Sequence, residues 1–319
     1  MVKRLQRLRG SPHLRNLLST VDFNRSQLIQ PLFAVESVKA DEPIPGLRGT
    51  FRQNLESTLK QIEKDLENGV TQFILFNVPA GKKKRDFDHA FSTRMIQSIR
   101  KRFGSDLYLW VDACLCSLTE SGHCCVYHSD SARQDLETTL NEISSLALSY
   151  IEAGADAISP SDMQDGRVAA IREKLDGAGK DLAPIMSYST KFASHFYGPF
   201  RNAADSAPQF GDRNEYQIDV RNRDDALGSS DRCAEEGADL LMVKPGMSSI
   251  DLIREIHTRT GLAVGAYQVS GEYAALDVLE EKGLLKFEPA LLETWSVFKR
   301  AGAQYVITYG ARYAKKLGI

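Results

Sequence analysis

Eight short apolar runs, separated by stretches of helical character, constrain the fold of this 319-residue chain more than any other feature. The runs span residues 28–35, 73–78, 108–114, 157–161, 183–188, 239–245, 262–269 and 304–309. They are continuous rather than alternating, as expected of parallel strands that are covered on both faces. Between them, apolar residues recur at helical spacing, for example Leu55, Leu59, Ile62 and Leu66. The sequence therefore predicts a strand-then-helix repeat.

Four glycines reinforce this repeat, because each one ends a helical stretch and leads into a strand. Gly69, Gly154, Gly237 and Gly302 precede the second, fourth, sixth and eighth runs. Glycine just after a helix supplies the left-handed turn that ends it. Eight strand-helix units in one chain favour a closed α/β barrel, the (β/α)8 TIM barrel, over an open doubly wound sheet. No GxGxxG motif follows the first run, which also disfavours a dinucleotide-binding fold.

Residues 1–27 precede the first run and begin with a basic stretch, so we expect an extended N-terminal arm, followed by a catalytic barrel over residues 28–319. No apolar stretch follows the basic start, as a signal peptide would require, and a transit peptide is the alternative to an arm. The sequence has no run of about 18 apolar residues, so it predicts no membrane span. Forty Lys and Arg against 42 Asp and Glu argue against a nucleic-acid-binding protein. We expect a cytoplasmic enzyme.

Polar side chains gather where the runs end, which is where such a barrel builds its active site. Lys244 closes the sixth run and Lys191 follows the fifth, so both are expected at the barrel mouth. Burial and mutual repulsion lower the pKa of a lysine, and a neutral amine attacks ketones to form an imine. The alternative is that each lysine caps a strand or pairs with an acid. Two lysines on adjacent strands favour imine chemistry.

Four of the five cysteines fall between Cys114 and Cys125, at the end of the third run. Three thiolates with an open position are typical of a catalytic zinc site, whereas a structural site is closed by four ligands. His123 is either a further ligand or an outer partner of such a site. The spacing is not that of a zinc finger, and a set of buried free cysteines is the alternative.

A long segment from His195 to Gln217 follows Lys191 and is rich in Gly, Pro, Arg and aromatic residues. It is too long for an ordinary connection, which indicates a lid over the barrel mouth. Arg201 and Arg213 within it are suited to hold a carboxylate through paired hydrogen bonds. The alternative is a solvated loop whose arginines bind nothing specific.

Together these segments resemble the porphobilinogen synthase (5-aminolevulinate dehydratase) family, in its zinc-dependent type, over nearly the whole chain. The matching segments are LMVKPGM at 241–247, SYSTKFA at 187–193, FYGPFR at 196–201, PSDMQDGRV at 160–168, YQVSGE at 267–272, and DACLC at 112–116 with GHC at 122–124. The resemblance implies a hydro-lyase of tetrapyrrole (heme) biosynthesis that condenses two 5-aminolevulinate molecules into porphobilinogen, with loss of two waters. It also implies an arm that wraps a neighbouring subunit in a homo-octamer.

The resemblance assigns roles to individual residues. Lys244 and Lys191 would form Schiff bases with the substrates in the P site and the A site, and Asp112 would be a further catalytic residue. The catalytic zinc would be held by Cys114, Cys116 and Cys124. The substrate-binding residues would be Arg201, Arg213 and Gln217 at the A-site carboxylate, Ser270 and Tyr309 at the P-site carboxylate, Ser161 near the P-site amino group, and Tyr197, Phe200 and Tyr267 lining the pocket.

Two departures from the family pattern bear on metal binding. Cys125 stands where the family usually has Gly, which leaves Cys124 and Cys125 as alternatives for the third zinc ligand. Ser229 stands where magnesium-activated members carry Glu, so we do not expect an allosteric Mg²⁺ site. Two other interpretations compete. A metal-free class I aldolase-type lyase would need one lysine and no thiolate cluster, and an inactive homologue would bind a ligand without converting it.

Overall fold

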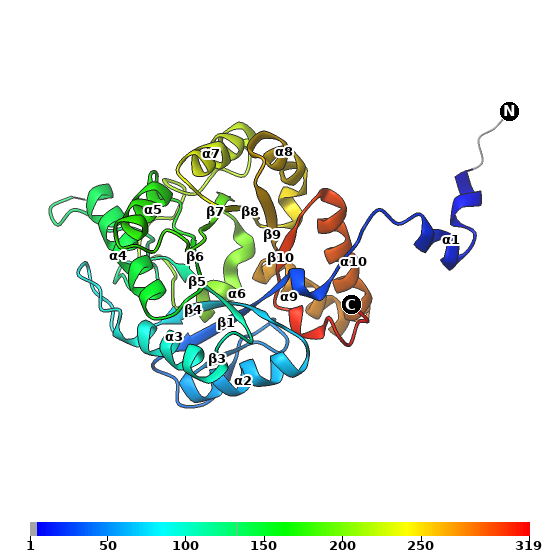
Figure 1. Cartoon of the computed structure of the whole chain (residues 1–319), viewed down its shortest axis with the longest axis horizontal. Coiled ribbons are helices and arrows are strands. Elements are labelled where there is room, and N and C mark those ends of the chain that lie inside the picture. The colour runs from blue at the N-terminus through cyan, green and yellow to red at the C-terminus, as the bar shows by residue number, and fades with distance from the viewer. Residues whose placement is uncertain (1–4, 132) are drawn as a thin grey trace.

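The eight apolar runs form eight parallel strands in the computed structural model, which describes residues 5–131 and 133–319. The strands are β1 (Leu28–Val35), β4 (Gln72–Val78), β5 (Tyr108–Ala113), β6 (Ala157–Pro160), β7 (Met186–Lys191), β8 (Leu240–Lys244), β9 (Ala263–Tyr267) and β10 (Tyr305–Ile307). Their order is β6-β5-β4-β1-β10-β9-β8-β7. A parallel bridge between Ile158 and Ile185 joins the two end strands and closes the ring. The predicted (β/α)8 barrel is confirmed (Figure 1).

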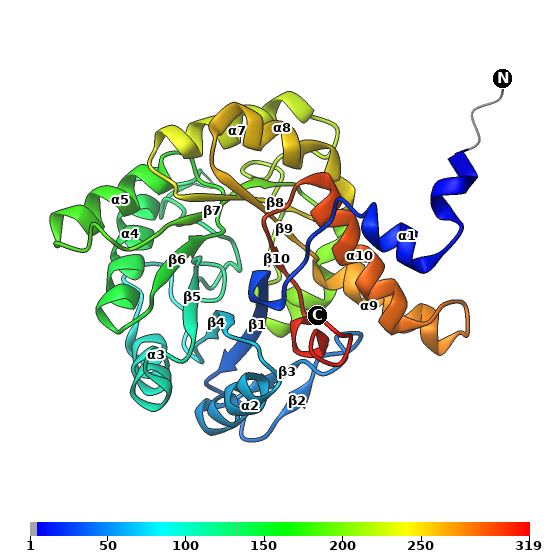
Figure 2. The ribbon, with the colours of Figure 1, turned by 45° about the vertical axis from the view of Figure 1, so that its right-hand side comes forward.

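Helices cover the outside of this barrel, as Figures 1 and 2 show. They are α2 (Leu55–Glu67), α3 (Ala90–Phe103), α4 (Leu136–Glu152), α5 (Arg167–Gly177), α7 (Arg223–Glu235), α8 (Ile250–Thr260), α9 (Ser270–Glu281) and α10 (Phe287–Ala301). Within α2, Ile62 from the predicted apolar stripe is fully buried, whereas Leu55 in the first turn is exposed. The four predicted helix-ending glycines have positive φ angles between 80° and 108°, the left-handed conformation that ends a helix.

The boundaries of β7 differ from the prediction. This strand begins at Met186 rather than at residue 183, and it continues through Lys191. Pro184 has no N–H to donate to a neighbouring strand, so regular pairing starts only after it. Lys191 therefore lies on the strand itself, paired in register with Lys244 at the end of β8.

Two short strands were missed by the sequence prediction. β2 (Glu42–Pro43) and β3 (Phe51–Gln53) form an antiparallel pair, and β3 also lies parallel to the last part of β1. Segments of two or three residues are too short to show the alternation that predicts a strand.

Residues 5–27 lie outside the barrel, and Figures 1 and 2 show this segment, with α1 (Pro12–Leu17), extending away from it. Its leucines at positions 5, 8, 17 and 18 are between 47% and 79% exposed. The first four residues of the predicted arm are outside the described residues, and its role in subunit contacts stays a prediction. Across the described ranges, no helix has both the length and the apolar character needed to cross a membrane.

An ion pair is buried where the loop after β6 meets β7. Arg167 Nε lies 3.2 Å from Asp162 Oδ1, and neither side chain is exposed. Arg167 also donates hydrogen bonds to the Gln164 carbonyl at 3.1 Å, to Ser187 Oγ at 3.2 Å and to the Tyr188 carbonyl at 3.3 Å. The guanidinium group thus fixes the end of β6 against the strand that carries Lys191.

Replacing this arginine should destabilise the fold strongly. We expect Arg167→Met to lower the free energy of unfolding by about 3–5 kcal/mol, because it leaves the buried carboxylate of Asp162 without its partner. Chemical denaturation followed by circular dichroism measures the effect. Arg259→Met is the matched control, since it breaks an exposed pair with Asp231, and exposed pairs contribute little. Similar losses in both variants would contradict a special role for the buried pair.

Candidate active site

Lys191 and Lys244 end two adjacent strands at the barrel mouth, and each is only 4% exposed. The side-chain nitrogen of Lys191, Nζ, donates a hydrogen bond to the carbonyl of Ser161. Lys244 Nζ is surrounded by four aromatic rings, with centroids 4.3 Å (Tyr267), 4.9 Å (Tyr188), 4.9 Å (Phe200) and 5.2 Å (Tyr197) away. Burial, and then the charge of Lys191, hold the pKa of Lys244 well below its usual 10.5. The geometry thus favours a neutral, nucleophilic amine at Lys244.

Asp112 lies near the end of β5, which β6 alone separates from the strand that carries Lys191. Burial raises the pKa of this carboxyl group to about 6, although the charges of Lys191 and Lys244 and a hydrogen bond from Ser161 oppose the shift. A carboxyl group that titrates near neutral pH is suited to accept and return a proton. The structure therefore brings Asp112 and Ser161 together beside the lysines.

Cys114, Cys116 and Cys124 bring their thiols within 4.8 Å of one another, and all three are buried. Hydrogen bonds from Cys114 and Cys116 hold the pKa of Cys124 well below the ordinary thiol value. The hydrogen bond to Cys116 raises the pKa of Cys114. One thiolate is thus stabilised by two neighbouring thiols, an arrangement of soft donors that fits a metal ion such as zinc. The buried cluster can bind a metal.

Cys125 is not part of this group of three thiols. Burial raises the pKa of Cys125 to about 12, with the charge of Cys124 adding to the shift, so its thiol stays protonated at neutral pH. Because the thiolate is the metal-binding form of cysteine, the geometry favours Cys124 over its neighbour as the third ligand.

The lid, residues 195–217, contains a 3-10 turn (His195–Tyr197) and the short helix α6 (Gly198–Ala203). Arg213 is buried and donates a hydrogen bond to the Gly122 carbonyl at 2.9 Å, while Arg201 is half-buried. Burial, followed by the charge of Arg213, lowers the pKa of Arg201. Gln217 is 2% exposed, and neither of its amide atoms has a hydrogen-bond partner among the described residues. Because unpaired buried polar atoms are rare, Gln217 is a candidate contact for a ligand.

Ser270 and Tyr309 lie on the other side of Lys244. Ser270 begins α9, and its hydroxyl accepts a hydrogen bond from Phe200 N at 3.1 Å. The Tyr309 hydroxyl lies 3.2 Å from that of Tyr267, one of the four rings around Lys244. A helix start and hydroxyl groups are both suited to hold a carboxylate.

Residues of the predicted lid cover the mouth, since the Tyr197 hydroxyl donates to the Lys244 carbonyl and the Phe200 ring lies against Lys244 Nζ. The cavity lined by Asp112, Cys114, Cys116 and Phe200 of the lid measures only about 10 Å³. This cavity beside the thiols is thus too small for more than a water molecule.

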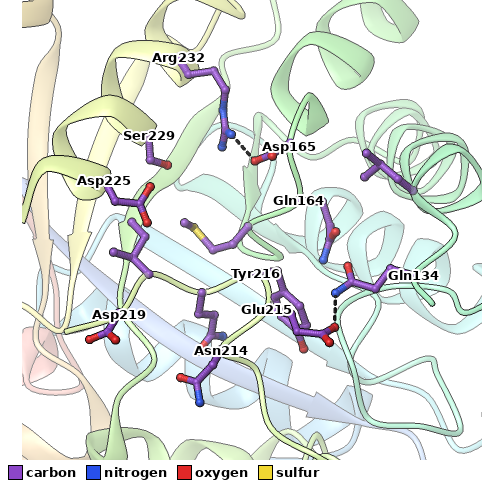
Figure 3. Close-up of a pocket in the computed structure, with 14 residues that line it drawn as sticks. Gln134, Gln164, Asp165, Asn214, Glu215, Tyr216, Asp219, Asp225, Ser229 and Arg232 are labelled. Atoms are coloured by element: carbon purple, nitrogen blue, oxygen red, sulfur yellow. Dashed lines mark hydrogen bonds and ion pairs between the residues drawn. The ribbon is translucent and has the colours of Figure 1, made fainter. Parts of the chain in front are cut away.

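A larger and more acidic pocket, of about 480 Å³, lies outside the mouth between the end of the lid and α7. Figure 3 shows Arg232 pointing to Asp165, with which it forms an ion pair, and Ser229 on the same wall. The Ser229 hydroxyl donates a hydrogen bond to the Ser189 carbonyl at 2.7 Å. The acids of this pocket do not converge: in the described ranges, only the three cysteines form a group of three candidate metal ligands. The absence of an allosteric magnesium site stays a prediction.

Tyr188 was missed as a site residue, although it lies in a segment that carries the family resemblance. Tyr188 and Lys191 are three residues apart, so regular alternation would put them on opposite faces of β7. The strand register shifts between Ser187 and Thr190, and as a result the ring of Tyr188 lies within 5.8 Å of Lys191 Nζ and 4.9 Å of Lys244 Nζ. A bulge of this kind leaves no mark in the pattern of apolar residues.

Fold and site together define a (β/α)8-barrel enzyme whose mouth carries two buried lysines and three buried thiols. Residues 2–317 match the family model described as delta-aminolevulinic acid dehydratase. The chain is 40% identical to the delta-aminolevulinic acid dehydratase of Helicobacter pylori, over 99% of both chains. It is also 40% identical to that of Methanothermobacter thermautotrophicus, over 97% of this chain and 95% of the other. The chain belongs to the delta-aminolevulinic acid dehydratase family.

A solved structure of this family is similar over most of both chains. The delta-aminolevulinic acid dehydratase (porphobilinogen synthase) of Toxoplasma gondii, crystallised with the reaction product porphobilinogen, superposes with a TM-score of 0.94 at 36% identity. The alignment covers 99% of this chain and 91% of the other. The predicted family and fold are confirmed.

Proposed function

We propose that this chain is a porphobilinogen synthase, which condenses two molecules of 5-aminolevulinate into porphobilinogen with the loss of two waters. The observation that carries the proposal is the pair of buried lysines, Lys191 and Lys244, at the ends of adjacent strands. The named activity of the family relatives and the product in the Toxoplasma structure support the same reaction. In a class I aldolase-type lyase, the second lysine and the three thiols would have no role in the reaction.

Each lysine would bind one substrate through its ketone. The neutral amine of Lys244 attacks the carbonyl carbon, the oxygen leaves as water, and the resulting imine withdraws electrons from the neighbouring carbon. That carbon then loses a proton and becomes a nucleophile. Lys191 would hold the second ketone in the same way. Asp112 lies beside both amines and would accept and return protons during these steps.

The carboxylates of the two substrates would be held on opposite sides of the lysines. Arg201, Arg213 and Gln217 of the lid would bind the A-site carboxylate, and Ser270 and Tyr309 would bind the P-site carboxylate. Ser161 would contact the P-site amino group, and Tyr197, Phe200 and Tyr267 would line the pocket around Lys244. Fixing two identical molecules in different orientations is what makes an asymmetric condensation efficient.

The metal of the thiol group would be zinc, held by Cys114, Cys116 and Cys124 with one position left open. When bound there, zinc supplies a Lewis acid next to the second substrate. The alternative, a closed structural site, would need a fourth ligand. His123 does not offer one, because both of its ring nitrogens are engaged by Tyr216 and Phe210.

We further propose a cytoplasmic homo-octamer in which residues 1–27 of each chain contact a neighbouring subunit. The exposed leucines of this segment support the proposal, because they have no apolar cover within the described part of one chain. No allosteric magnesium is expected.

The direct test is porphobilinogen formation from 5-aminolevulinate by the pure, reduced protein. We expect product in the presence of zinc, detected by its colour reaction with an aromatic aldehyde. A folded, zinc-loaded chain that yields no product would favour the inactive homologue instead.

A further inference from the structure

The loop that carries the thiols is bonded to the lid along most of its length. We call residues 114–125 the metal loop. Its contacts with the lid are Ser117 Oγ to the Ala204 carbonyl (2.9 Å), the Ser121 carbonyl to Gln209 N (2.9 Å), and the Gly122 carbonyl to Arg213 Nη2 (2.9 Å). At Gly122, where φ is +69°, a side-chain carbon would lie 2.1 Å from the Ala207 carbonyl oxygen. The two segments therefore pack backbone against backbone.

His123 lies at the centre of this interface and is almost fully buried. Its Nε2 lies 2.9 Å from the carbonyl oxygen of Phe210, and its Nδ1 lies 2.9 Å from the hydroxyl of Tyr216. A carbonyl oxygen can only accept a hydrogen bond, so Nε2 must carry the proton. We assign Nδ1 as the acceptor and the Tyr216 hydroxyl as its donor, because that hydroxyl already accepts a hydrogen bond from the backbone N–H of Cys124.

The same hydroxyl continues the chain to a metal-binding residue. Tyr216 Oη accepts a hydrogen bond from the backbone N–H of Cys124, at 3.4 Å. The direction of donation thus runs from Cys124 N–H to Tyr216, from Tyr216 to His123, and from His123 to the Phe210 carbonyl. Aromatic contacts enclose the chain, since the His123 ring centroid lies 4.8 Å from that of Phe210 and 5.4 Å from that of Tyr127. Hydrogen bonds in such a series polarise and strengthen one another.

We propose that His123 is a positioning residue that couples closure of the lid to occupation of the metal site. The proposal rests on the proposed zinc role of the three thiols. Metal binding fixes Cys124, and the hydrogen-bond chain holds the lid at Phe210 only while Cys124 and Tyr216 are in place. Because coupling between two equilibria is reciprocal, a closed lid must also tighten metal binding by the same factor. The enzyme would then close over its substrates most firmly when the metal is present.

The coupling can be measured without substrate, by limited proteolysis with chymotrypsin. Phe210 is half exposed at the lid surface, so the bond after it reports lid opening. We expect zinc to slow cleavage at this bond in the wild type by about 5- to 150-fold, the range of typical coupling between sites. In His123→Ala the ratio of rates without and with zinc should fall toward one. Tyr216→Phe should do the same, since it removes only the central hydroxyl.

The design separates coupling from simple loss of stability. A merely structural defect raises the rate of cleavage with and without zinc alike, whereas loss of the hydrogen-bond chain lowers the ratio of the rates without and with zinc. His128→Ala is the matched control. His128 lies four residues beyond Cys124, its side chain is 46% exposed, and it takes no part in the hydrogen-bond chain, so this variant should keep the wild-type ratio. Tyr216→Phe keeps the test valid if His123→Ala does not fold.

Two outcomes would overturn the proposal. One is that zinc does not change the rate of lid cleavage in the wild type, even though titration with a coloured chelator shows that zinc is bound. The other is full protection by zinc in both His123→Ala and Tyr216→Phe. If the wild-type chain binds no zinc, both the coupling and the proposed metal site are refuted. Parallel assays of porphobilinogen formation then show whether the proposed reaction still takes place.

Discussion

Lys244→Ala should reduce porphobilinogen formation by about 10⁴-fold or more, the range in which loss of a covalent nucleophile falls. No other described lysine combines the end position on a barrel strand with a surrounding shell of four aromatic rings. Burial lowers its pKa well below 10.5, so the amine is available for attack at pH values where an exposed lysine is protonated. Water cannot replace it, since only an amine forms the imine.

The covalent step can be observed directly. Borohydride reduction in the presence of 5-aminolevulinate should add mass at Lys244, and this labelling should occur at neutral pH. Lys101→Ala is the control, because Lys101 is exposed on α3, one of the helices that cover the outside of the barrel (Figure 1), and this variant should keep full activity. Labelling confined to other residues would refute the assignment, and labelling at Lys244 in Lys191→Ala would show that the two amines act independently.

The barrel could be predicted from the chain because its determinants are local. Parallel strands covered on both faces read as continuous apolar runs, and Gly69, Gly154, Gly237 and Gly302 mark the turns before alternate strands. The exact first and last residues of the strands could not be predicted as well from the sequence. Pro184 delays the start of β7, and a three-residue strand such as β3 depends on its partners rather than on its own pattern.

The site was predictable to the extent that its residues sit at strand ends. Lys191, Lys244 and the cysteines follow from that rule, but the contacts between distant segments do not. Tyr188 reaches the mouth only through an irregularity in β7. His123 was expected near the metal as a ligand or an outer partner, and its bond to the Phe210 carbonyl, 87 residues away in sequence, depends on how the lid folds back. Such long-range geometry is absent from the pattern of any one segment.

Cys116→Ala should lose the metal and with it the activity. Three thiols within 4.8 Å form the candidate zinc site, and removal of one leaves two ligands, too few for a stable site. We expect about one zinc per chain in the wild type and almost none in the variant after dialysis, measured by atomic absorption. In the wild type, a strong chelator should abolish porphobilinogen formation, and added zinc should restore it.

The neighbouring cysteines supply the comparison that identifies the third ligand. Cys124→Ala should behave like Cys116→Ala, because neighbouring thiols hold the pKa of Cys124 low and keep it in the metal-binding form. Cys125→Ala should keep its zinc, since burial raises the pKa of that thiol to about 12 and it lies outside the group of three. The reverse pattern would move the site to Cys125. Product that persists after verified zinc removal would instead keep the reaction and assign the thiols another role.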